Sequence, residues 1–91
     1  MASQHTIPSH AADVEAEIVG TEMVLYHPQL TNAVYLNPTA ALIWGLCDGR
    51  RSVREIVGII ENTYPDAGPT LSEDVGEVVD RLQGTGVIVV R

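Results

Sequence analysis

The hydrophobic pattern of the chain changes its period at Asn37-Pro38, and this change limits the possible folds more than any other feature. Before it, apolar and charged residues alternate in Val14-Glu15-Ala16-Glu17-Ile18, which is typical of a half-buried strand. After it, apolar residues recur every three or four positions, as they do in amphipathic helices. Strands that precede helices, instead of alternating with them, predict an α+β domain.

Three short strands are expected before the change of period. The first starts at Val14, Gly20-Thr21 provides a two-residue hairpin turn, and the second strand covers residues 22–27. Turn residues follow from His27-Pro28, and the third strand is expected over residues 33–36. The sequence therefore predicts a three-stranded antiparallel sheet.

Two helices are expected directly after the sheet. Asn37 is a good N-cap with Pro38 in the first turn, and these residues begin a helix over about 38–47. Ser52-Val53-Arg54-Glu55 has the spacing of a capping box and begins a second helix, which ends at Tyr64-Pro65.

A third helix is expected from the capping-box spacing Thr70-Leu71-Ser72-Glu73 to Gly84. Its predicted core stripe has Val79 at one margin, and Asp74 and Arg81 at the other. The stripe itself consists of Leu71, Val75, Val78 and Leu82. Residues 87–90 predict a short C-terminal strand, and the whole layout is of winged-helix type.

The chain of 91 residues is long enough for one small hydrophobic core. Residues 1–12 have no periodic apolar pattern and are expected to be a flexible tail, so the predicted domain covers residues 13–91. The N-terminus lacks the pattern of an export signal, and the apolar runs are too short to span a membrane. The expected compartment is the cytoplasm.

Charge and side-chain chemistry argue against nucleic acids, metals and catalysis. Twelve acidic residues against five basic ones give a net charge of −7, which would repel a phosphate backbone. The single cysteine, Cys47, lies on an apolar stripe and reads as a core residue. His5, His10 and His27 lack the spacing of a metal site. We expect no enzyme activity and no cofactor.

The segment Leu36–Val57 combines an Asn-capped helix of small residues, a Cys-Asp-Gly-Arg-Arg turn and a capped second helix, in that order. In this combination it resembles the PqqD-like family, small domains also called RiPP recognition elements. The resemblance continues through Glu73-Asp74-Val75 to a closing segment at residues 84–88. Domains of this family bind the leader peptides of ribosomally synthesised precursors.

The resemblance implies that a leader peptide adds as a further strand to the edge of the third strand, in a groove beneath the third helix. An edge strand has unpaired N–H and C=O groups that an extended peptide can satisfy. The implied site comprises Ala33, Val34, Tyr35 and Leu36 on the strand, and Asp74, Val75, Val78, Val79, Arg81 and Leu82 on the helix. Which margin of the helix faces the peptide stays open.

The resemblance also implies a separate modifying enzyme as partner. Examples of such an enzyme are a radical S-adenosylmethionine protein in pyrroloquinoline quinone biosynthesis and a leader peptidase in a lasso-peptide pathway, and another modified-peptide pathway fits as well. Two alternatives are a winged-helix DNA-binding regulator and a subunit that only scaffolds an enzyme complex. The first is disfavoured because the third helix has Arg81 against Glu73, Asp74, Glu77 and Asp80. The second predicts no affinity for a free peptide.

Overall fold

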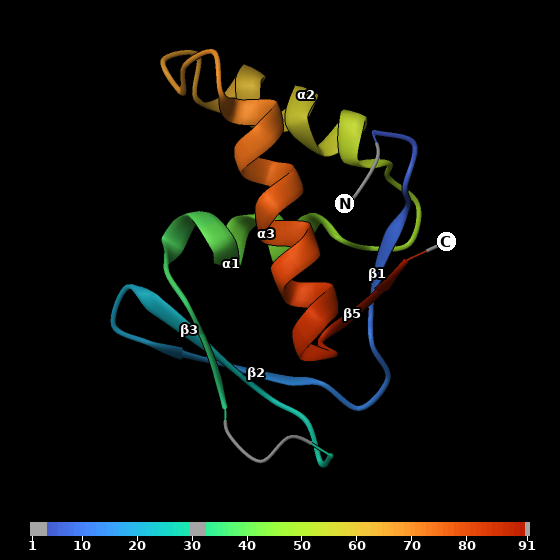
Figure 1. The fold of residues 1–91 in the computed structure, drawn as a ribbon. Helices are drawn as coiled ribbons and strands as arrows, with labels where there is room; N and C mark the ends of the chain where they lie inside the picture. Colours follow the sequence, from blue (N-terminus) through green and yellow to red (C-terminus); the bar gives the residue numbers. More distant parts are fainter. Residues whose placement is uncertain (1–3, 30–32, 91) are drawn as a thin grey trace.

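The computed structural model describes residues 4–29 and 33–90. Its strands and helices are, in chain order, β1 (Pro8–His10), β2 (Glu15–Val19), β3 (Glu22–Tyr26), β4 (Val34–Leu36), α1 (Pro38–Leu46), α2 (Val53–Thr63), α3 (Leu71–Thr85) and β5 (Ile88–Val90). Figure 1 shows the three helices gathered on one side of the β2–β3–β4 sheet. The predicted α+β class, with a sheet, three helices and a short last strand, is confirmed.

The sheet is an antiparallel meander in the order β2-β3-β4. Gly20, with a φ of 65°, lies in the tight turn between β2 and β3. Met23 and Leu25 of β3 are opposite Leu36 and Val34 of β4, so these four side chains share the face that turns toward the helices. This inner face connects the sheet to the hydrophobic core.

The predicted N-caps of α1 and α2 are both present. The Asn37 side chain accepts a hydrogen bond of 2.8 Å from the backbone N–H of Ala40. In α2, the Ser52 hydroxyl accepts from the N–H of Glu55, and the Glu55 carboxylate accepts from the N–H of Ser52. These local bonds satisfy backbone groups that the first turn of a helix leaves unpaired.

The predicted ends of α3 are wrong in detail. The Thr70 hydroxyl donates to the Asp74 carboxylate at 3.1 Å, and its side chain makes no capping bond to the backbone. Thr70 has backbone angles of −92° and 5°, unlike the extended N-caps of α1 and α2. At the other end, the left-handed residue that closes the helix is Gly86, at φ 86°, and not Gly84.

The predicted tail over residues 1–12 is wrong for Pro8–His10, which form β1 and pair antiparallel with β5. Pro8 is buried, and the preceding backbone is bonded to α2: the carbonyl of Thr6 accepts from the N–H of Val53 at 2.9 Å. A strand of three residues is too short to show a period, and its partner lies at the other end of the chain. The pattern therefore did not reveal it.

The core lies between the three helices, β5 and the inner face of the sheet. Its buried members are Leu25, Leu36, Ala40, Ile43, Trp44, Cys47, Val53, Ile56, Val57, Ile60, Leu71, Val75, Val79, Leu82, Val87 and Ile88. Trp44 also donates from Nε1 to the carbonyl of Val87 at 3.4 Å. Among the described helices, none is long and apolar enough to cross a membrane.

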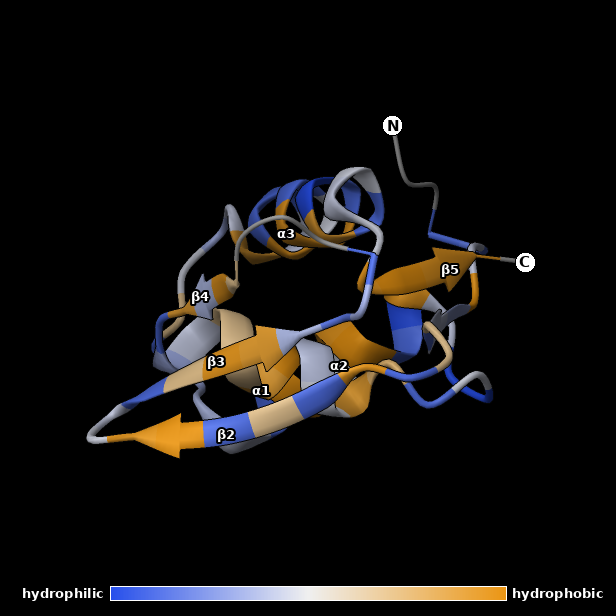
Figure 2. Cartoon of the chain, turned by 90° about the horizontal axis from the view of Figure 1, so that it is seen from below, coloured by the Kyte–Doolittle hydropathy of each residue, from blue (hydrophilic) through white to orange (hydrophobic). Residues whose placement is uncertain are grey.

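The prediction that β2 is half-buried is wrong, because all five of its residues are exposed. Helix α1 packs against β3 and β4, whereas β2 extends past the helical layer. Figure 2, which views the sheet from below, shows β2 in front of the other elements at one side of the molecule. The alternating pattern of β2 thus has an apolar face that the chain itself does not cover.

Candidate functional site

The free edge of β4 is the first component of the candidate site. β4 pairs with β3 along one side, and no other described strand pairs with it. Its free side therefore presents main-chain donors and acceptors over Val34–Leu36. Figure 2 shows β4 between β3 and α3, so an added strand would run beside this helix.

A cavity of about 470 Å³ is the second component. It lies where the start of α1, the end of α2 and the first half of α3 meet. Its lining residues are Pro38, Thr39, Leu42, Ile43, Ile60, Tyr64, Ala67, Leu71, Asp74, Val75 and Val78. Pro38 follows β4 by two residues, so the cavity begins where the free strand edge ends.

The structure decides which margin of α3 contributes to this cavity. Asp74 and Val78 line it, together with Val75, whereas Val79, Arg81 and Leu82 do not. Val79 is fully buried in the core and Val78 is only half-buried. The prediction that Val78 belongs to the core stripe and Val79 to its margin is therefore wrong. Either valine continues an apolar stripe on a helical wheel, and only the position of α1 and α2 distinguishes them.

The predicted strand residues separate into two groups. Leu36 is fully buried, and Val34 packs half-buried against the core. Tyr35 has 69% of its surface exposed and points to the opposite face of the sheet. Ala33 lies just before β4 and is half-buried. The strand therefore offers its backbone edge, and not a row of side chains, to a ligand.

Eight of the cavity residues were not predicted as site residues from the sequence: Pro38, Thr39, Leu42, Ile43, Ile60, Tyr64, Ala67 and Leu71. Leu42 carries a usable signal, because it is apolar and lies off the α1 stripe formed by the buried residues. Tyr64 follows the last residue of α2 and has 55% of its surface exposed. The cavity wall is thus mainly apolar, with the Asp74 carboxylate as its charged group.

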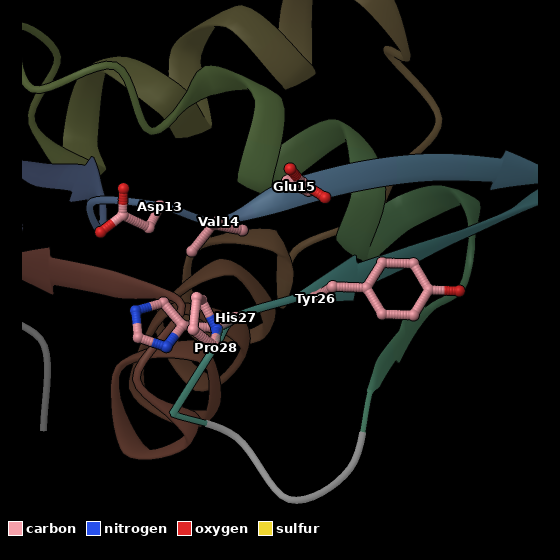
Figure 3. A pocket seen from close by; sticks show the side chains of 6 residues that line it. All are labelled: Asp13, Val14, Glu15, Tyr26, His27 and Pro28. Carbon is pink, nitrogen blue, oxygen red and sulfur yellow. The ribbon is translucent and has the colours of Figure 1, made fainter.

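A second cavity, of about 460 Å³, lies at the opposite end of the β2–β3 hairpin from its turn. It is lined by Asp13, Val14, Glu15, Tyr26, His27 and Pro28. In Figure 3, the side chains of Asp13, Glu15 and Tyr26 point in different directions and do not converge on one point. His27 accepts from the N–H of Gln29 through Nδ1. The described residues contain no cluster of metal-ligating side chains.

Cys47 is a core residue, as predicted. It is fully buried, its thiol donates to the carbonyl of Ile43, and burial together with the nearby Asp48 raises its pKa to about 12. The thiol is therefore protonated near neutral pH and is not an activated nucleophile.

Comparison with known proteins finds two curated relatives of similar sequence. The chain is 33% identical over 61 residues to the PqqA binding protein of Pseudomonas putida (strain W619), covering 67% of this chain and 64% of that protein. It is 37% identical over 57 residues to the PqqA binding protein of Pseudomonas fluorescens (strain SBW25), covering 63% and 59%. The chain thus spans less than two thirds of the length of these curated relatives.

Two solved structures share the fold. TbiB1 in complex with the TbiA(beta) leader peptide matches with a TM-score of 0.74 and 24% identity, over 88% of this chain and 93% of that one. The heterocyclase TruD matches with a TM-score of 0.67 and 18% identity, over 94% of this chain and 12% of that one. The family described as Coenzyme PQQ synthesis protein D (PqqD) matches residues 22–88, which is most of the chain. The resemblance found in the sequence is confirmed: the chain belongs to the PqqD family.

Proposed function

We propose that this protein is a non-catalytic recognition protein that binds the leader of a ribosomally synthesised precursor peptide as an added strand on β4. The observation that carries the proposal is the free β4 edge, which ends at an apolar cavity beneath α3. The curated relatives are named for binding PqqA, and the TbiB1 structure contains a leader peptide, so both support it.

Main-chain pairing supplies the general part of the proposed affinity. The sheet has two free edges among the described strands, β2 and β4. Charged Glu15 and Glu17 occupy β2, and charges on an edge strand discourage pairing. Val34–Leu36 has no charged side chain and ends two residues before Pro38, which lines the cavity. We therefore assign the peptide to β4.

The cavity supplies the selective part. Side chains of an added strand point alternately to the two sides of the sheet, so those on the inner side enter the space beside α3. Leu42, Val75 and Val78 suit an apolar side chain, and Asp74 suits a lysine or arginine beside it. The net charge of −7 also favours a leader that carries basic residues.

The bound leader is presented, in this proposal, to a separate modifying enzyme. This enzyme is a radical S-adenosylmethionine protein or a lasso-type leader peptidase, and the protein acts in the cytoplasm, where ribosomes release precursor peptides. We propose that the peptide-binding domain comprises residues 13–91 together with β1 of the N-terminal segment. A purely scaffolding subunit would show no affinity for a free leader, and this difference distinguishes it from the proposed recognition protein.

Calorimetric titration tests the proposal with the leader of the precursor peptide encoded beside this protein. The N–H groups of successive strand residues point to opposite edges, so Val34→Pro and Tyr35→Pro remove donors on opposite sides of β4, and only one of these sides is free. Each proline variant is compared with alanine at the same position. We expect at least one proline variant to weaken binding by about tenfold or more, and its alanine counterpart by less than about threefold. Circular dichroism checks the folding of each variant. A folded wild-type protein that binds no such leader contradicts the proposal.

A further inference from the structure

The β2–β3–β4 sheet has a second face, which turns away from the helices. Val24 of β3 is opposite Glu17 of β2 and Tyr35 of β4, so these three side chains form one row across that face. The pairs Glu15–Tyr26 and Val19–Glu22 form the neighbouring rows. We call the seven residues Glu15, Glu17, Val19, Glu22, Val24, Tyr26 and Tyr35 the outer sheet face.

The outer sheet face has three exposed aromatic or aliphatic side chains. Tyr35, Val19 and Tyr26 have 69%, 55% and 43% of their surfaces exposed. Val24, in the central row, is only 4% exposed and is not a member of the core cluster named above. Aromatic side chains over an aliphatic centre are typical of protein interfaces.

The charges on this face determine what can cover it. Glu15 and Glu17 on β2 and Glu22 at the start of β3 lie beside the apolar residues, and β2, β3 and β4 contain no lysine or arginine. The Tyr26 hydroxyl donates to the Glu17 carboxylate at 3.4 Å. Partial desolvation, followed by the charge of Glu17, raises the pKa of Tyr26, so the phenol remains a neutral donor.

A second copy of this chain is a poor partner for the outer sheet face. Two such faces would bring three carboxylates of each copy together, and the whole chain has a net charge of −7. A surface with arginine or lysine between apolar side chains is complementary. Arginine pairs with carboxylates in two-pronged geometry and also stacks on tyrosine rings.

We propose that the outer sheet face binds the modifying enzyme, through a surface of that enzyme that combines arginine or lysine with apolar side chains. This inference rests on the proposed leader binding. Tyr35 links the two surfaces, because the backbone of β4 forms the free edge while the Tyr35 side chain points to the outer face. An enzyme bound here lies directly beside the peptide strand.

Binding of the enzyme encoded beside the precursor tests this inference. Glu17→Arg and Tyr26→Ala change the outer sheet face, and neither residue lines the cavity beside α3 or belongs to β4. We expect each to weaken enzyme binding by about tenfold or more and to leave leader affinity within about twofold. Wild-type affinity for the enzyme should also fall with added salt. Glu61→Arg makes the same charge change at an exposed position of α2 and should alter enzyme binding by less than about threefold.

Three outcomes overturn the inference. In the first, folded Glu17→Arg and Tyr26→Ala proteins bind the enzyme as tightly as the wild type does. In the second, Glu61→Arg weakens the complex as much as Glu17→Arg, which points to net charge alone. In the third, the protein forms a dimer that Tyr26→Ala dissociates. Loss of leader binding in the wild type is a separate result, measured in a separate titration, and concerns only the proposed function.

Discussion

The ring of His10 stacks on the ring of Trp44, with centroids 3.7 Å apart and an angle of 5° between the planes. His10 Nε2 also lies 2.6 Å from the backbone carbonyl oxygen of Trp44, which can only accept, so this ring nitrogen donates. The contact connects β1 to α1 and covers the buried tryptophan. The N-terminal segment is therefore part of the domain.

Deletion of residues 1–10 should destabilise the protein. It removes β1, the buried Pro8 and the hydrogen bonds from Val53 and Arg54 to the N-terminal backbone. We expect the thermal midpoint to fall by at least about 10 °C, which corresponds to about 2 kcal/mol in a domain of this size. His10→Ala keeps the strand and should cost about 1 kcal/mol. An unchanged midpoint after the deletion would show that β1 adds nothing to stability.

Trp44→Ala should be among the most damaging single substitutions. Trp44 is 8% exposed and contacts the core, so alanine leaves a large cavity. We expect a loss of about 3 to 5 kcal/mol in the free energy of unfolding, measured by urea denaturation. A loss below about 1 kcal/mol would mean that the ring lies on the surface.

Stability should decrease at alkaline pH because of Cys47. Its pKa is raised from 9.0 to about 12 in the folded state, so between these values the unfolded chain loses the proton first. The contribution of the neutral thiol is thus complete below about pH 9 and is lost as the pH rises toward about 12. Denaturation at several pH values checks this, with Cys47→Ala as the control. The alanine variant should show a smaller decrease; an equal decrease would exclude Cys47 as the cause.

Val78 and Val79 offer a matched test of the cavity. Val78→Asp introduces a charge at the cavity wall, and we expect leader affinity to fall by about tenfold or more while the protein still folds. Val79→Asp places the same charge in the fully buried core and should unfold the protein. Circular dichroism and calorimetry measure the two effects. The cavity assignment is wrong if a folded Val78→Asp protein binds the leader normally.

Local patterns predicted most of the fold. Asn37 and Ser52 cap helices through bonds to residues three positions ahead, so their roles are visible in the sequence. The pairing of β1 with β5 and the contact between His10 and Trp44 join distant segments, and no local period encodes them. The exposure of β2 likewise depends on where the helices end, since its alternation alone also fits a covered strand.

Only part of the candidate site could be predicted, because the rest depends on contacts between segments that are distant in the sequence. The resemblance indicated β4 and α3; Asp74, Val75 and Val78 of α3 line the cavity, whereas no residue of β4 does. The distinction between Val78 and Val79 required the packing of α1 and α2 against α3, which a helical wheel does not contain. Leu42 and Tyr64 come from other helices and meet α3 only in the folded chain.

Hydrogen exchange of individual backbone amides, measured by NMR with and without the leader peptide, tests directly whether the leader pairs with β4 as an added strand. A peptide strand on β4 forms new hydrogen bonds with outward amides of Val34–Leu36, while those of β2 keep their exposure. We expect the leader to slow exchange within β4 by about tenfold or more and to leave exchange at Glu15–Val19 unchanged. If, in a folded protein saturated with the leader, exchange slows at Glu15–Val19 but does not change at Val34–Leu36, the assignment of the peptide to β4 is contradicted.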